Sequence, residues 1–188
     1  THQGAFDISY LRGIPNMTLL APYNETTMKL CMRFAKEYDH PCAFRYPRGA
    51  FLAQDRESSA YELGKSALLK EGEKILFIGY GNGVGRAEEV AELVEVNPAV
   101  LDLRFVKPLD EEMLVTLSQK YKKWFVFSDS AAQGGVGSAI LELLSQEKIN
   151  DVALTTFEYD DAFITHGNTK LVEESLGILP EQLAKRIV

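Results

Sequence analysis

Short apolar runs alternate regularly with amphipathic stretches across the second half of this chain, and this pattern constrains the fold more than any other feature. The amphipathic stretches carry apolar residues at helical spacing, whereas the runs between them have the length of buried strands. Strands that alternate with helices in this way are typical of βαβ units and of a parallel sheet. We expect strands at residues 74–79, 99–105, 124–127 and 152–157, and helices at 84–94, 110–120, 134–146, 169–176 and 180–187.

Right-handed crossovers between parallel strands place helices on both faces of such a sheet. Residues 67–188 are therefore predicted to form an α/β three-layer sandwich with a mostly parallel sheet. About 120 residues suffice for one compact domain. A short edge strand is expected within 63–69. Residues 51–66 lack a clear helical or strand period, so we interpret them as a linker.

The first fifty residues predict a smaller unit. A strand is expected at 17–22, a helix at 25–38 and a strand at 42–44, with a short helix at 5–12 before them. This order is one βαβ unit, and about fifty residues bury too little apolar surface to fold alone. The unit must pack against the rest of the chain or against a missing N-terminal half. Because the sequence starts at Thr1 without Met, we expect a piece of a longer protein.

Charge and cysteine content exclude several classes of protein. The net charge is −7, and no basic face stands out, which argues against a nucleic-acid partner. No apolar run approaches the roughly 20 residues that cross a bilayer, so we expect no membrane association through a spanning helix. Cys31 and Cys42 do not form a Cys-x-x-Cys pair. This usage favours a reducing, cytoplasmic location over a disulfide or a metal site.

The most informative short stretch is Arg-Tyr-Pro-Arg-Gly at 45–49, directly after the strand expected at 42–44. Pro47 biases the preceding residue toward an extended shape, and Gly49 allows a sharp turn. Ligands of open α/β sheets lie outside the carboxyl ends of strands, and guanidinium groups match phosphate oxygens. We therefore predict a phosphate or carboxylate held by Arg48, with Arg45 as a second candidate. The alternative is that both are surface cations paired with nearby acids.

Glycine-rich turns invite phosphate-loop interpretations that their spacing does not support. In residues 79–85 no glycine starts the offsets 0, 2 and 5 that a dinucleotide fingerprint needs, so a tight strand-to-helix turn is favoured. Gly64-Lys65-Ser66 lacks the earlier glycine and the buried strand of a P-loop. Residues 134–138 predict another turn before a helix. No Gly-x-Ser-x-Gly elbow occurs, which leaves a hydrolase triad unsupported.

His2 and His166 each allow more than one interpretation of their role. Residues 160–167 contain two acids and His166 without the ligand spacing of known metal sites, so a surface loop at a domain or subunit contact is favoured over a metal site. His2 lies beside Gln and Gly, where a histidine is usually just exposed. If the chain continues upstream, His2 instead lies in a loop before a helix and is a candidate for proton exchange near neutral pH.

Taken together in order, several motifs resemble the family of 1-deoxy-D-xylulose-5-phosphate synthases, which are thiamine-diphosphate enzymes of transketolase type. The resemblance covers essentially the whole chain, and the joint occurrence of its motifs is specific although each alone is not. The matching residues are 1–12, 14–16, 45–49, 102–110, 134–138 and 163–167.

The resemblance implies an enzyme that condenses pyruvate with D-glyceraldehyde 3-phosphate and releases carbon dioxide. Residues 1–50 would end the pyrimidine-binding domain, and residues 67–188 would be the transketolase C-terminal domain. By the same resemblance, His2 is the catalytic candidate that lines the reaction pocket. Arg48 would contact the phosphate of the acceptor, which agrees with the prediction from the strand end.

The family's diphosphate and Mg²⁺ motif, a Gly-Asp-Gly…Asn pattern, does not occur in this sequence, and neither does a recognisable counterpart of its activating glutamate. Thiamine diphosphate and Mg²⁺ are therefore expected in the full-length enzyme, bound outside this chain. We expect the chain alone to be inactive, the N-terminal portion of the same enzyme to be its partner, and the assembly to be a homodimer.

Other interpretations stay open. The family often has two glutamates where this chain has Ser128-Asp129, which raises the alternative of a divergent paralogue. Another transketolase-like enzyme, such as a 2-oxo acid dehydrogenase β subunit, is a second alternative. A third, of a different class, is a non-catalytic module that serves oligomerisation or regulation.

Overall fold

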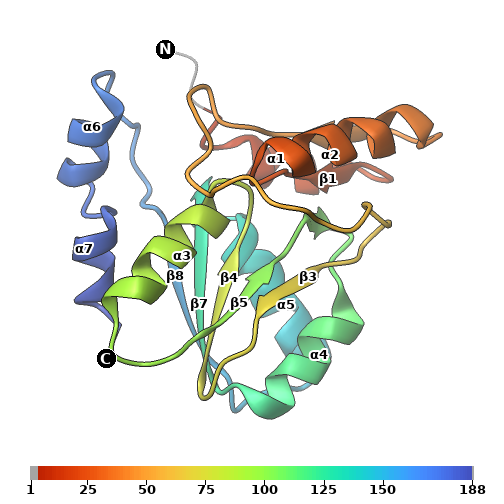
Figure 1. Ribbon diagram of the computed structural model, residues 1–188. Helices are drawn as coiled ribbons and strands as arrows, with labels where there is room; N and C mark the ends of the chain where they lie inside the picture. Colours follow the sequence, from red (N-terminus) through yellow and green to blue (C-terminus); the bar gives the residue numbers. More distant parts are fainter. Residues whose placement is uncertain (1–3, 188) are drawn as a thin grey trace.

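The computed structural model describes residues 4–187 and contains two sheets (Figure 1). The larger sheet has the strand order β3-β5-β4-β7-β8, in which β4 pairs in parallel with β5 and β7, and β7 in parallel with β8. Only its edge strand β3 is antiparallel, so the predicted mostly parallel sheet is confirmed. The strands are β3 (Ala67–Lys70), β4 (Ile75–Gly79), β5 (Ala99–Asp102), β7 (Lys123–Ala131) and β8 (Ala153–Tyr159).

Helices cover both faces of the large sheet, which confirms the three-layer sandwich (Figure 1). Alternate residues of β4 show the division: Leu76 and Ile78 pack toward α4 and α5, whereas Ile75 and Phe77 pack toward α3 and α7. Asp110 caps α4 as expected, since its side chain accepts from the Met113 amide. The helices are α3 (Gly83–Leu93), α4 (Glu111–Lys120), α5 (Val136–Gln146), α6 (Thr169–Ser175) and α7 (Pro180–Ala184).

The first fifty residues form the predicted βαβ unit. In order they give α1 (Asp7–Arg12), β1 (Thr18–Leu20), α2 (Glu25–Glu37) and β2 (Cys42–Phe44), and β1 pairs in parallel with β2. Asn24 caps α2, and its side chain accepts from the Thr27 amide at 2.8 Å. This unit lies over the same end of the large sheet as α6 (Figure 1).

No helix within residues 4–187 is long and apolar enough to cross a bilayer.

One predicted strand, 99–105, is in fact two. β5 ends at Asp102, and β6 (Phe105–Lys107) pairs antiparallel with β1 in the small sheet. The chain turns at Arg104, whose φ is 55° and whose amide donates to the buried Asp102 carboxylate at 3.1 Å. Burial raises the pKa of Asp102 to about 7, and Arg104 opposes that shift. Because this buried pair lies inside an apolar run, the sequence pattern predicted one strand where the structure has two.

Arg104, which lies between β5 and β6, also forms hydrogen bonds with the linker at residues 51–66. Its guanidinium donates to the Ala60 carbonyl at 3.1 Å and to the Ser58 hydroxyl at 2.9 Å. The Tyr61 hydroxyl donates to the Ala21 carbonyl at 3.0 Å. Residues 51–66 thus contain no helix or strand, as expected, but they are bonded to the two sheets rather than loosely crossing between them.

Three glycines bring α3 against its neighbours. A Cβ on Gly79 would lie 2.4 Å from the Val84 Cα, and one on Gly83 would lie 1.9 Å from the Phe127 carbonyl oxygen. A Cβ on Gly85 would lie 2.4 Å from the Ala53 amide nitrogen. Real side-chain contacts are not this short, so only glycine allows these approaches. The glycine-rich turn therefore serves close packing of the first turn of α3 against β7 and the linker.

We expect Gly83→Ala to lower the free energy of unfolding by on the order of 3 kcal/mol, because the new methyl group forces backbone apart. Gly13→Ala is the matched control, since a Cβ there lies 3.8 Å from its nearest atom, the Tyr10 carbonyl oxygen. Urea unfolding of both variants measures the difference. Equal unfolding free energies for the two variants would contradict the close-packing role of the turn.

Candidate functional site

A cleft of about 640 Å³ opens where the small βαβ unit meets the large sheet. One wall is the loop at 45–50 that follows β2, and the other is the segment at 164–176 with α6. Its floor includes Asn82, Asp129 and Tyr159, which lie after or at the carboxyl ends of β4, β7 and β8. This is the position where open α/β sheets bind ligands, as the sequence analysis expected for the arginine loop.

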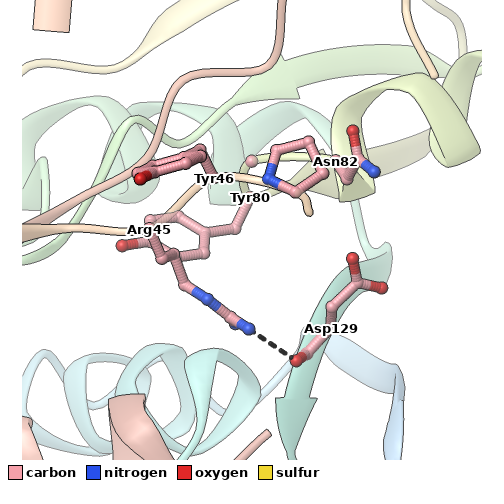
Figure 2. Close-up of a pocket in the computed structure, with 7 residues that line it drawn as sticks. Arg45, Tyr46, Tyr80, Asn82 and Asp129 are labelled. Carbon is pink, nitrogen blue, oxygen red and sulfur yellow. Dashed lines mark hydrogen bonds between the residues drawn. The ribbon is translucent and has the colours of Figure 1, made fainter. Parts of the chain in front are cut away.

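The guanidinium of Arg45 forms hydrogen bonds and an ion pair within the protein. Its guanidinium donates to the Asp129 carbonyl at 3.0 Å and to the Gly4 carbonyl at 3.2 Å, and it pairs with the Asp7 carboxylate at 3.4 Å. Figure 2 shows its side chain reaching across a small adjoining cavity of about 60 Å³ to the backbone of Asp129. The half-buried Arg45 therefore ties the arginine loop to α1 and to β7.

Arg48 has a different environment. It is exposed, it lines the cleft, and the described residues give it no hydrogen bond or ion pair. Among residues 4–187 its guanidinium thus keeps its donors available to a ligand. The sequence treated the two arginines as similar candidates, and the structure separates them. His2, the catalytic candidate, lies outside the described residues.

Beneath the floor of the cleft, Arg86 joins two acids. It is 3% exposed, and its Nη1 and Nη2 atoms lie 2.6 Å from the carboxylates of Asp129 and Glu173 respectively. Burial alone would lower the pKa of Arg86, but the two carboxylates outweigh it and the pKa is raised. For Glu173 burial dominates and raises the pKa, with Arg86 as the opposing influence.

The second glycine-rich turn already holds an anion of its own. The buried Glu158 carboxylate accepts from the Val136 amide at 2.8 Å and the Gly137 amide at 3.1 Å, at the first turn of α5. A Cβ on Gly135 would lie 2.5 Å from that carboxylate. Burial raises the pKa of Glu158 to about 7 although these amides favour its charged form. The turn accommodates an internal carboxylate in the place where a phosphate would bind.

These contacts occupy the acids of the cleft and leave cationic side chains available to a ligand. The acids Asp7, Asp129 and Glu173 are each paired with an arginine, whereas Arg48 and His166 have no such partner among the described residues. No group of three His, Cys, Asp or Glu side chains within residues 4–187 could hold a metal ion. The cleft can therefore orient a phosphorylated or carboxylated small molecule against its arginine wall.

Sequence reasoning missed several residues of this site. It placed His166 in a surface loop at a contact, and it left Arg86, Asp129 and Glu173 without a role. Asp129 carried one usable signal, because it is a polar residue in the strand region that ends at the ligand-binding edge. Arg86 carried another, as a charged residue directly after a glycine-rich turn. Glu173 gave none.

Comparison with known proteins places this geometry in a family. The chain matches the family described as "Transketolase, C-terminal domain" over residues 64–183, and "Transketolase, pyrimidine binding domain" over residues 1–52. It is 59% identical over 189 residues to a 1-deoxy-D-xylulose-5-phosphate synthase of Sulfurimonas denitrificans. It is 57% identical to the protein of the same name from a Nitratiruptor species. Both matches cover 100% of this chain but only 31% of the relative.

A solved structure shows the same fold. The protein described as "Split gene transketolase, inactive beta4 tetramer" superposes with a TM-score of 0.87 over 96% of this chain and 60% of its own, at 24% identity. The chain therefore belongs to the transketolase family, and over its whole length it is similar to 1-deoxy-D-xylulose-5-phosphate synthases about three times as long.

Proposed function

We propose that this chain is part of a thiamine-diphosphate-dependent synthase that condenses pyruvate with D-glyceraldehyde 3-phosphate to 1-deoxy-D-xylulose 5-phosphate and carbon dioxide. The observation that carries this proposal is the guanidinium of Arg48, which has no partner within residues 4–187 and lies on the wall of a cleft at the carboxyl ends of the strands. The names and identities of the relatives support the same reaction.

In this proposal Arg48 binds the phosphate of the acceptor. A guanidinium presents two parallel N–H donors to a phosphate, and no described carboxylate competes for those of Arg48. Arg45, proposed from the sequence as a second substrate-binding residue, acts instead by holding the loop at 45–49 against β7. Fixing that loop before the acceptor arrives reduces the entropy that binding must overcome.

The described part of the cleft offers no ligand set for the Mg²⁺ of the cofactor. Its acids are already paired with arginines, and no three-ligand group occurs within residues 4–187. We propose that the remaining part of the full-length protein holds thiamine diphosphate and Mg²⁺, and that this part carries the cofactor chemistry. His2 keeps its proposed place in the reaction pocket.

The N-terminal portion of the same enzyme is the proposed partner, and the whole is a proposed homodimer in the cytoplasm. Apolar side chains on α1 and on the loop before α6 support an interface there, since Tyr10 is 64% exposed and Phe163 90%. Phe6 packs edge-on against Phe163, with ring centroids 5.8 Å apart. We propose a division into residues 1–50, 51–66 and 67–188, with the chain inactive by itself.

A second candidate is a subunit of another transketolase-like enzyme. It is favoured by the TM-score of 0.87 to the split-gene transketolase, of which this chain covers 60%. A transketolase subunit of this kind would accept ketose donors instead of pyruvate. A chain that assembled with itself and had no activity with any partner would be the non-catalytic module.

The function is tested by mixing the chain with its upstream portion, thiamine diphosphate, Mg²⁺, pyruvate and D-glyceraldehyde 3-phosphate, and measuring carbon dioxide release. We expect release from the mixture and from the full-length protein, and none from the chain alone. Activity with a ketose donor but not with pyruvate would favour the second candidate. No activity of the full-length protein with either donor would contradict both enzyme proposals.

In the full-length enzyme we expect Arg48→Ala to raise the KM for glyceraldehyde 3-phosphate by about 10- to 100-fold. Hydrogen bonds to charged groups contribute roughly 1.5–3 kcal/mol, and about 1.4 kcal/mol corresponds to a factor of ten. The KM for pyruvate should stay within about twofold. Arg33→Ala, on the exposed side of α2, is the control. Equal changes in both KM values would remove the assigned role of Arg48.

A further inference from the structure

We propose that Arg86 is a positioning residue that sets the spacing between the two walls of the cleft, and thereby the affinity for the phosphorylated acceptor. This inference rests on the proposed function. Arg86 is buried under the floor of the cleft and does not line it. It acts through Asp129 on one side and Glu173 on the other.

The first wall depends on Arg86 through Asp129. The Asp129 backbone carbonyl accepts from Arg45 at 3.0 Å, and the Asp129 side chain accepts from Arg86 at 2.6 Å. Figure 2 shows the first of these bonds, in which the backbone of β7 meets the guanidinium of the arginine loop. One residue thus joins the loop that carries Arg48 to the buried guanidinium. A shift of Asp129 would move that loop.

The second wall depends on Arg86 through Glu173. No residue of α6 is buried, and Leu171 on this helix is largely exposed. Within the described residues, the other hydrogen bonds of α6 side chains stay inside the helix and its cap. The Glu174 carbonyl of α6 also accepts from the Gln182 side chain of α7 at 3.1 Å. Among the described residues, the ion pair of Glu173 with Arg86 is the polar contact that joins α6 to α3 at the cleft. The segment just before α6 carries His166 to the cleft.

The chemistry of the guanidinium makes this connection rigid. Two different nitrogens of Arg86, Nη1 and Nη2, contact the two acids, so the planar group fixes the angle between them. A lysine presents one nitrogen and could not do this. Because Arg86 is buried, loss of Glu173 leaves the Nη2 donor of the guanidinium without its carboxylate acceptor, and the wall on that side is released.

The test compares Glu173→Ala with Glu174→Ala in the full-length enzyme. Glu174 is the next residue of the same helix, is exposed, and forms no ion pair with the described residues. Both variants remove one helical glutamate and have the same helix propensity. Glu173→Gln keeps a hydrogen-bond acceptor at the same length and serves as the conservative variant. The readouts are kcat, the KM for each substrate, and hydrogen exchange over residues 163–176.

We expect Glu173→Ala to raise the KM for glyceraldehyde 3-phosphate about tenfold, with kcat and the KM for pyruvate within about twofold. Exchange over residues 163–176 should accelerate in this variant, and Glu173→Gln should restore part of both effects. Glu174→Ala should match the unmodified enzyme. Indistinguishable behaviour of Glu173→Ala and Glu174→Ala, or equal losses for both substrates, would overturn the inference.

Failure of the proposed function is distinguishable from failure of this inference. If the unmodified full-length protein releases no carbon dioxide, the proposed reaction is wrong, and hydrogen exchange decides the inference. Faster exchange over residues 163–176 in Glu173→Ala alone would then support Arg86 as the residue that holds this wall. Unchanged exchange would overturn it.

Discussion

A buried guanidinium shared by two carboxylates organises the end of this molecule where ligands can bind. Arg86 reaches Asp129 on β7 and Glu173 on α6, and Asp129 in turn receives Arg45 from the loop after β2. One network of charged side chains thus joins the loop after β2 in the small sheet, β7 in the large sheet and the C-terminal helix α6. Asp7 pairs with Arg45, and Asp129 and Glu173 share Arg86, so Arg48 has no carboxylate partner among the described residues and its donors stay available to an external anion.

The glycine-rich turns make this arrangement sterically feasible. Gly83 lets α3 begin against the backbone of β7, which brings Arg86 within reach of Asp129. At the other turn, Gly135 and Gly137 leave room for the carboxylate of Glu158 against the amides of α5. Both turns resemble phosphate loops in composition, but they serve packing and an internal anion. In this account the anion of the substrate is recognised by an arginine side chain instead.

Sequence reasoning predicted the architecture well, because the signals for it are local. The alternation of strands and helices, the caps Asn24 and Asp110 and the helix start at Pro180 are all visible within a few residues. The division of 99–107 between two sheets was missed, since it depends on a buried Asp102–Arg104 pair inside an apolar run.

The site was harder to predict because its contacts join distant positions. Arg45 and Arg48 stand three residues apart and look alike, yet the partners of Arg45 are Asp7 and Asp129. The partners of Arg86 lie 43 and 87 residues away along the chain. No local pattern specifies which acid a guanidinium will meet, so roles of this kind require the fold.

The most direct test of the central claim is a structure of the full-length protein with glyceraldehyde 3-phosphate bound. The account predicts phosphate oxygens about 3 Å from the guanidinium of Arg48, with Arg45 still bonded to the Asp129 carbonyl. A phosphate bound elsewhere, with Arg48 pointing into solvent, would contradict it.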